Sequence, residues 1–202
     1  MTDQGTQRSE HFGLVVYPQF EVLDAFGPTE ILHCLGHPLI CPGMNITLSI
    51  IGPTLDPVST GPAKGDPSPV KSRIAQTIVP THTFDNPPMD IDVLIVPGGF
   101  GSGPKAFFGG AWEPTCVERV IEFLREQYPT LKHLLSRWQI QNLAARAVLY
   151  FTMTDDASAV CSGAGLAARA GILDRQKATT NKQFWKAITD VGPKTHWVAS
   201  AR

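Results

Sequence analysis

The 202-residue sequence has little net charge and no long hydrophobic run. Its 17 Lys and Arg residues nearly balance its 18 Asp and Glu residues, so no basic excess points to nucleic acid or to an anionic membrane surface as a partner. No apolar segment approaches the roughly 20 residues that a membrane-spanning helix needs. The polar start, MTDQGTQRSE, also lacks the apolar core of a signal peptide.

Cysteine is scarce as well, with only Cys34, Cys41, Cys116 and Cys161. Their spacing does not match a secreted disulfide framework, which indicates a reducing compartment. We therefore expect a cytoplasmic protein with neither nucleic acid nor membrane as a partner.

Short apolar runs alternate with helical patterns along the chain. Strands are expected at Phe12–Tyr17, Asn45–Ile51, Arg73–Val79, Ile91–Val96, Leu131–Leu135 and Thr195–Ser200. Helices are expected from Pro28 through Thr29–Leu35, and at Glu113–Gln127, Gly163–Ala170 and Asn181–Asp190. The sequence therefore predicts one α/β domain, a flavodoxin-like three-layer sandwich around a mostly parallel sheet.

The segment AVCSGAG, from Ala159 to Gly165, is the strongest candidate for a reactive site. A small apolar lead-in, a cysteine and a helix of small residues are typical of a nucleophile elbow, in which the side chain stands at a sharp strand-to-helix turn. The start of a helix supplies positive potential that favours a thiolate. A buried structural cysteine is the alternative interpretation of Cys161.

Two further motifs accompany this one: LDAFGPTE at Leu23–Glu30 and VPGG at Val96–Gly99. With VCSGAG they resemble the ThiJ/PfpI superfamily (class I glutamine amidotransferase-like), and within it the isocyanide hydratase-like branch. The segments PTHTF, from Pro80, and ATTNK, from Ala178, add to the resemblance.

The resemblance implies a role for each matching residue. Cys161 would be the nucleophile and Asp24 the carboxylate that shuttles protons. The amides of Gly99 and Ser162 would stabilise developing negative charge. The implied reaction adds water to a small-molecule substrate, an isocyanide, to give an N-substituted formamide without a cofactor. Since many relatives pair, the resemblance also implies a homodimer. Without the resemblance, Asp24 could instead cap a helix, and Gly98-Gly99 could be an ordinary turn after a strand.

The sequence also differs from the family in three places. Asn181 stands where some relatives carry histidine, which disfavours a Cys–His peptidase. We expect a single domain at residues 10–202 with an insertion at about 137–159 and a shortened C-terminus. These differences keep open an alternative function, a redox-sensing or catalytically inactive protein with an oxidisable Cys161.

One segment contains side chains of the types that bind metals, at His33, Cys34, His37 and Cys41. Pro38 and Pro42 interrupt this pattern. No second ligand pair follows at a zinc-like spacing, so no metal is expected.

Overall fold

The computed structural model describes residues 8–62, 74–103, 117–131 and 161–200. Its strands are β1 (Arg8–Val15), β2 (Met44–Gly52), β3 (Val58–Ser59), β4 (Thr77–Ile78), β5 (His82–Thr83), β6 (Val93–Ile95), β7 (Lys177–Ala178) and β8 (His196–Trp197). Its helices are α1 (Val22–Leu35), α2 (Val117–Gln127), α4 (Gly163–Arg169) and α5 (Trp185–Thr189), with the 3-10 turns η1 (Phe100–Ser102) and η3 (Tyr128–Thr130). The expected insertion at 137–159 and most of the expected strand Leu131–Leu135 lie outside the described residues.

The main sheet has four parallel strands in the order β5-β2-β1-β6. The pairing of β1 with β2 runs in register from Arg8 opposite Met44 to Val15 opposite Ile51. On its other side β1 pairs with β6, with Phe12 opposite Val93. The prediction of an α/β fold with a mostly parallel sheet is confirmed.

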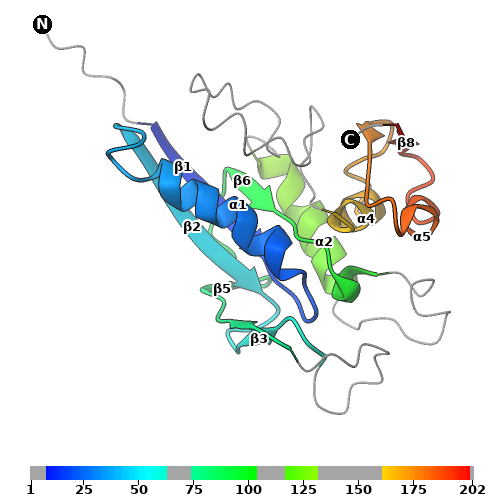
Figure 1. The fold of residues 1–202 in the computed structure, drawn as a ribbon, viewed down its shortest axis with the longest axis horizontal. Helices are drawn as coiled ribbons and strands as arrows, with labels where there is room; N and C mark the ends of the chain where they lie inside the picture. Colours follow the sequence, from blue (N-terminus) through cyan, green and yellow to red (C-terminus); the bar gives the residue numbers. More distant parts are fainter. Residues whose placement is uncertain (1–7, 63–73, 104–116, 132–160, 201–202) are drawn as a thin grey trace, which may run out of the picture.

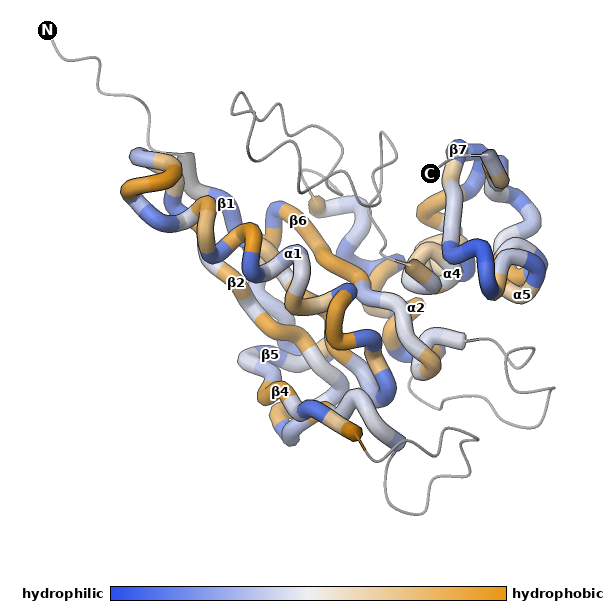
Figure 2. The backbone as a smooth tube through the Cα atoms, in the orientation of Figure 1, coloured by the Kyte–Doolittle hydropathy of each residue, from blue (hydrophilic) through white to orange (hydrophobic). Residues whose placement is uncertain are grey.

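Helices cover both faces of this sheet. Figure 1 shows α1 crossing in front of β1 and β2, while α2 passes behind the end of β6. The apolar strand β6 is buried along its whole length, as a parallel strand between two helical layers should be (Figure 2). On α2, the predicted stripe of Val117, Val120, Ile121 and Leu124 is buried, and the Phe123 ring lies 5.0 Å from that of Phe84.

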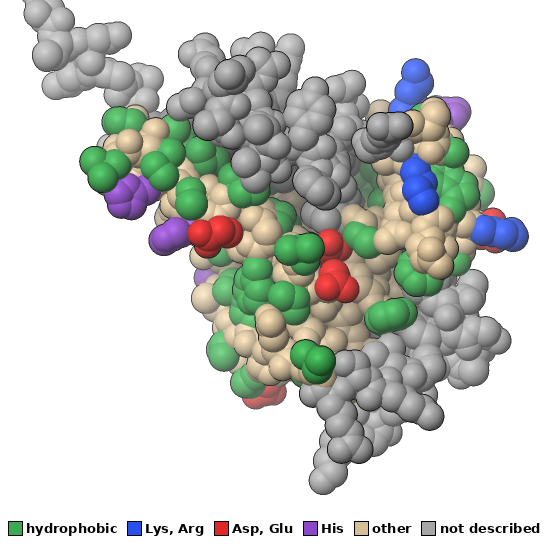
Figure 3. Space-filling model, in the orientation of Figure 1, with side chains coloured by type: hydrophobic (Ala, Val, Ile, Leu, Met, Phe, Trp, Pro, Cys, Tyr) green, Lys and Arg blue, Asp and Glu red, His purple; other side chains and the backbone are tan. Residues whose placement is uncertain are grey.

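Helix α1 begins earlier than its sequence predicts. The expected start at Pro28 is wrong, because the helix begins at Val22 and Pro28 lies inside it. An internal proline removes one backbone hydrogen bond, here the bond to the Asp24 carbonyl. The helix continues because its buried residues Ala25, Leu32 and Leu35 pack against the protein core. Its outer face leaves Leu23 and Phe26 exposed, and Figure 3 shows hydrophobic side chains gathered there beside acidic ones.

Three other elements are shorter than expected. The expected helix Asn181–Asp190 is reduced to Trp185–Thr189, because the Asn181 side chain accepts a hydrogen bond from the Gln183 amide and holds a turn there. The expected strands Arg73–Val79 and Thr195–Ser200 contain only two-residue strands, β4 and β8. Within the described ranges, no helix is long and apolar enough to cross a bilayer.

Candidate active site

The candidate site lies where the chain leaves β1 and β6 at their carboxyl ends. From β1 the chain passes through α1 to β2, whereas β6 pairs with the opposite side of β1. Such a switch in direction opens a crevice at the carboxyl ends of parallel strands, where ligands of open α/β sheets bind. Asp24 follows β1, and Gly98 and Gly99 follow β6, so two of the three sequence motifs lie at the carboxyl ends of these strands.

Gly98 is the point at which Asp24 and Ser162 meet. The Gly98 amide donates to Oδ2 of Asp24 at 2.9 Å, and the Gly98 carbonyl accepts from the Glu21 amide at 2.8 Å. A Cβ on Gly98 would lie 2.6 Å from Oγ of Ser162 and 2.9 Å from Oδ2 of Asp24. Both polar groups therefore lie within 3 Å of one point, although residues 24 and 162 are far apart in the sequence.

Gly99 joins the same group through its backbone. Its φ of 125° lies in a region that side chains disfavour, and a Cβ would lie 2.4 Å from the Gln19 carbonyl oxygen. The Gly99 amide donates to Oγ of Ser162 at 3.0 Å, so this amide is directed at the residue next to Cys161. The Ser102 hydroxyl contacts both the Gly99 carbonyl, at 2.7 Å, and Oγ of Ser162, at 3.1 Å. Ser102 was not among the site residues predicted from the sequence.

Cys161 has a left-handed backbone conformation directly before a helix, while the residues preceding it, where the strand of a nucleophile elbow is expected, lie outside the described residues. Its φ is 56°, a left-handed value that costs a residue with a side chain roughly 1–2 kcal/mol. Helix α4 begins two residues later, at Gly163, where a Cβ would lie 2.5 Å from the Val96 carbonyl oxygen. Small residues thus let the start of α4 approach the end of β6 closely. Cys161 is partly exposed, whereas Ser162 beside it is buried.

Asn181 contacts the Cys161 sulfur. Its Nδ2 donates to Sγ at 3.0 Å, and the neighbouring Thr180 hydroxyl donates to the Cys161 carbonyl at 3.0 Å. In the sequence, Asn181 stands out only as a replacement for histidine, and no role for it was predicted. The shared ATTNK segment was the signal that could have identified it.

Asp24 lies inside α1, as its third residue, which makes the helix-capping interpretation wrong. The N-cap is Glu21, and its side chain makes no capping hydrogen bond. Burial raises the pKa of the Asp24 carboxyl above its ordinary value; the hydrogen bond from the Gly98 amide opposes this rise, and the charge of Glu21 adds to it. A raised pKa brings the carboxyl closer to the neutral range in which a proton donor and acceptor works best.

A second polar cluster connects β1, β2 and the segment just before β6, away from the carboxyl ends of the strands. His11 contacts Oγ of Ser49 through Nε2 at 2.8 Å and Oδ1 of Asp90 through Nδ1 at 3.0 Å. This is the contact order of a Ser–His–Asp triad. However, the serine is 5% exposed and the carboxylate side chain 83% exposed, the reverse of what a hydrolase needs. We interpret the cluster as a cross-strand connection.

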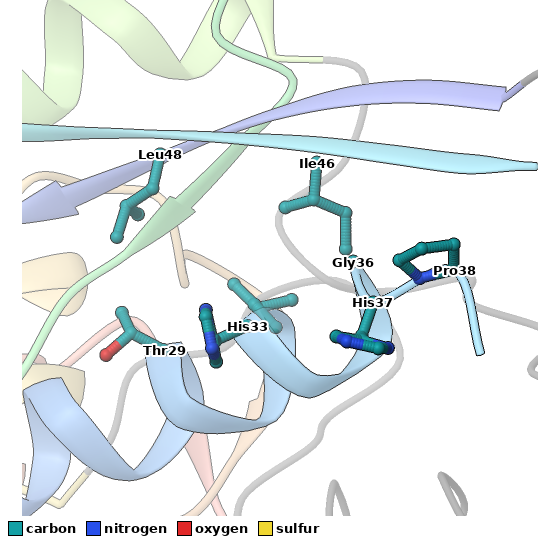
Figure 4. Close-up of a pocket in the computed structure, with 8 residues that line it drawn as sticks. Thr29, His33, Gly36, His37, Pro38, Ile46 and Leu48 are labelled. Atoms are coloured by element: carbon teal, nitrogen blue, oxygen red, sulfur yellow. The ribbon is translucent and has the colours of Figure 1, made fainter. Parts of the chain in front are cut away.

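A pocket of about 320 Å³ lies between the second half of α1 and β2. Figure 4 shows His33 and His37 on the helix side and Ile46 and Leu48 on the strand side. None of the residues at the candidate site lines this pocket. Among the described residues, no group of three or more His, Cys, Asp or Glu side chains could hold a metal ion.

The chain resembles one characterised enzyme in sequence. It is 25% identical over 180 residues to isonitrile hydratase from Pseudomonas putida, an alignment that covers 89% of this chain and 56% of the relative. The chain therefore spans about half the length of that relative. No family model matches the sequence.

Solved structures resemble the fold. An AraC family transcriptional regulator from Pseudomonas putida has a TM-score of 0.56 at 13% identity, covering 95% of this chain and 77% of that one. A two-domain protein from Anabaena variabilis, with DJ-1/ThiJ/PfpI-like and ferritin-like domains, has 0.55 at 13% identity, covering 95% and 40%. Drosophila melanogaster DJ-1beta has 0.52 at 15% identity, covering 96% and 76%. At these identities the likeness shows the fold alone.

Proposed function

We propose that the chain, which belongs to the ThiJ/PfpI superfamily, is a cofactor-independent hydratase that converts a small, apolar isocyanide into an N-substituted formamide. The observation that supports this most strongly is the convergence at Gly98, where Asp24 and Ser162 lie within 3 Å of one point beside the strained elbow of Cys161. The sequence similarity to isonitrile hydratase supports the substrate class.

In the first step, the Cys161 thiolate adds to the terminal carbon of the isocyanide and forms a C–S bond. The same carbon takes a proton from the Asp24 carboxyl, which gives a thioimidate. In this proposal the amides of Gly99 and Ser162 stabilise the negative charge that develops. Support comes from the hydrogen bond of the Gly99 amide to Oγ of Ser162 at 3.0 Å, which holds Gly99 at the residue next to Cys161.

In the second step, water attacks the thioimidate carbon, and the Asp24 carboxylate takes one proton from this water and passes it to the substrate nitrogen. The C–S bond of the tetrahedral intermediate then breaks, the thiolate of Cys161 leaves, and the hydroxyl proton passes to Asp24, which restores the carboxyl used in the first step. The sum is addition of one water molecule to the isocyanide. Acid–base assistance of this kind contributes about 10²–10⁴-fold in rate.

Aromatic side chains favour an apolar substituent on the substrate. Phe100 follows Gly99, and Phe184 lies three residues after Asn181. Their ring centroids are 6.4 Å apart in an edge-to-face contact, and Phe100 remains 43% exposed. Both rings belong to segments that carry proposed site residues, and apolar faces bind a hydrocarbon substituent better than a charged one.

The test is a turnover assay with purified protein and an aryl isocyanide, followed by detection of the formamide. We expect Cys161→Ala to abolish product formation and Asp24→Asn to reduce it by about 10²-fold or more. Cys34→Ala, at a partly exposed cysteine on α1, is the matched control and should leave turnover unchanged. No formamide from well-folded wild-type protein would reject the hydratase.

A redox-sensing role is the second candidate, favoured by the partial exposure of Cys161 and by the Asn181 amide at its sulfur. A peroxide would oxidise the thiolate to a sulfenate and be reduced to water. Mass spectrometry during a peroxide titration separates this role from an inert thiol. If Cys161 is oxidised no faster than Cys34, the redox role is rejected.

The family resemblance also supports a cytoplasmic homodimer. Leu23 and Phe26 on the outer face of α1 are exposed and form an apolar surface suited to self-association. Analytical ultracentrifugation of the wild type and of Leu23→Glu tests this proposal, since a monomeric wild type would contradict it.

A further inference from the structure

We infer that Asn181 is a further catalytic residue, which stabilises the Cys161 thiolate by donating a hydrogen bond to the sulfur, while Asp24 alone carries the reaction's protons. This inference rests on the proposed hydratase function and adds a residue to it. The contact that carries it is the 3.0 Å distance from Nδ2 of Asn181 to Sγ of Cys161.

The orientation of the Asn181 amide is fixed by its other end. Its Oδ1 accepts a hydrogen bond from the backbone amide of Gln183 at 2.8 Å. Because a backbone N–H can only donate, the oxygen must face Gln183, and the NH₂ group must then face the sulfur. The hydrogen bond to Cys161 therefore runs from nitrogen to sulfur, the direction that favours a negatively charged sulfur.

The segment around Asn181 is itself held against Cys161. Thr180 is buried and donates to the Cys161 carbonyl at 3.0 Å. Just before it, Ala178 at the end of β7 accepts a backbone hydrogen bond from Val198 at 2.8 Å. The amide of Asn181 thus lies on a backbone held both at Cys161 and at Val198, the residue after β8, so the donor is in place before substrate binds.

Some relatives carry histidine at this position. The neutral amide of Asn181 differs from a histidine because it neither gains nor loses a proton during the reaction. Asn181 can stabilise the thiolate in the resting state and again when the C–S bond breaks, but it cannot supply or remove a proton. The elements around this segment carry charged or titratable groups at Asp24 and Glu21 on the α1 side, Arg169 on α4, Lys177 on β7, Lys186 on α5 and His196 on β8. Next to Asn181, Nζ of Lys182 contacts Oγ1 of Thr179 and lies 4.3 Å from the Trp185 ring centroid. Of these, Asp24 is the proton carrier nearest to Gly98.

The test measures the rate of Cys161 alkylation by iodoacetamide from pH 5 to 10, resolved from the other cysteines by mass spectrometry. A hydrogen bond to a charged group is worth roughly tenfold to a hundredfold in an equilibrium constant. We therefore expect Asn181→Leu to move the midpoint of the pH dependence upward by about one to two pH units. Above that midpoint the variant should alkylate a few times faster than wild type, because a less stabilised thiolate is more nucleophilic.

Two further variants guard against misfolding and simple displacement. Asn181→Asp keeps the shape but replaces the donor with a carboxylate, so its midpoint should also move upward. Thr180→Val removes the bond to the Cys161 carbonyl and leaves the bond to sulfur, so it should lower stability without moving the midpoint. Cys34, whose sulfur lies 3.8 Å from Oε1 of Glu30, is the internal reference and should keep its midpoint in every variant.

An unchanged midpoint in both Asn181 variants would overturn the inference, whatever their turnover. A shifted midpoint in protein that does not hydrate isocyanides would support the role of Asn181 and reject only the proposed reaction. A loss of alkylation at every pH with the midpoint unchanged would indicate displacement of the thiol and would also overturn the inference.

Discussion

Replacing Gly98 with alanine tests the convergence of Asp24 and Ser162. The added Cβ would lie 2.6 Å from Oγ of Ser162, 2.8 Å from its backbone nitrogen and 2.9 Å from Oδ2 of Asp24. Real Cβ atoms essentially never approach other atoms within 3.0 Å, so at least one of these groups must move. Because one of them is a backbone nitrogen at the start of α4, a side-chain rotation alone cannot relieve the overlap.

The magnitude follows from the kind of displacement. Overpacking a well-packed region costs about 1–3 kcal/mol in the free energy of unfolding. Moving a reactive group by about 1 Å lowers the rate on the order of 10²-fold. We therefore expect Gly98→Ala to lose turnover by roughly that factor while the protein remains folded.

Urea unfolding and the isocyanide turnover assay together measure both effects. Gly27→Ala is the matched control, since Gly27 lies inside α1 and its nearest neighbour to an added Cβ is 3.9 Å away. An alanine there should raise the free energy of unfolding by about 0.5–1 kcal/mol, because glycine is a poor helix residue. If Gly98→Ala matches wild type in both stability and turnover, Asp24 and Ser162 do not meet at Gly98 as described.

Three further predictions concern other parts of the structure. Because burial raises the pKa of Asp24, its ionisation weakens the fold as the pH rises through that pKa. The Asp24→Asn side chain can still accept the hydrogen bond from the Gly98 amide, but it cannot ionise. Its free energy of unfolding in urea should therefore exceed that of wild type at pH 7, and this difference should close as the pH falls below 3.8. A difference that widens in acid would contradict this prediction. His11→Leu should lower the free energy of unfolding by about 1–3 kcal/mol, because it leaves the buried Ser49 hydroxyl without this partner. Adding Ser49→Ala should recover part of that loss. Strictly additive effects of the two substitutions on urea unfolding would argue against the contact. Cys161→Gly should be more stable to urea than Cys161→Ala by up to about 1 kcal/mol, because glycine tolerates a φ of 56°; equal stability would mean that the elbow is unstrained.

The sequence predicted the architecture well where hydrophobic pattern alone decides it. The continuous apolar run around β6 and the helical stripe on α2 are both buried as their periodicity requires. The pattern failed where tertiary contacts compete with local preference. Pro28 predicted a helix start, yet packing of Leu32 and Leu35 on the core carries the helix through it.

The site was less accessible to sequence reasoning than the fold. Resemblance to family motifs identified four candidate residues, Cys161, Asp24, Gly99 and Ser162. The structure brings the segments that carry them together. Ser102 and Asn181 were missed, because each acts through a contact with a residue at least 20 positions away in the chain. Contacts of that kind depend on the register between loops, which residue pattern does not specify.

Close contact between neighbouring segments explains why glycine recurs in the motifs at Val96–Gly99 and around Cys161. At Gly98 and at Gly163 a side chain would approach within 3 Å of atoms on a neighbouring segment, so the absence of a Cβ is what both positions require. That absence lets the end of β6, the first turn of α1 and the start of α4 lie in direct contact. The polar contacts among these segments then run largely through backbone amides, since Gly98 donates to Asp24 and Gly99 to Ser162. It follows that the arrangement of the candidate site depends more on these glycines than on any single polar side chain.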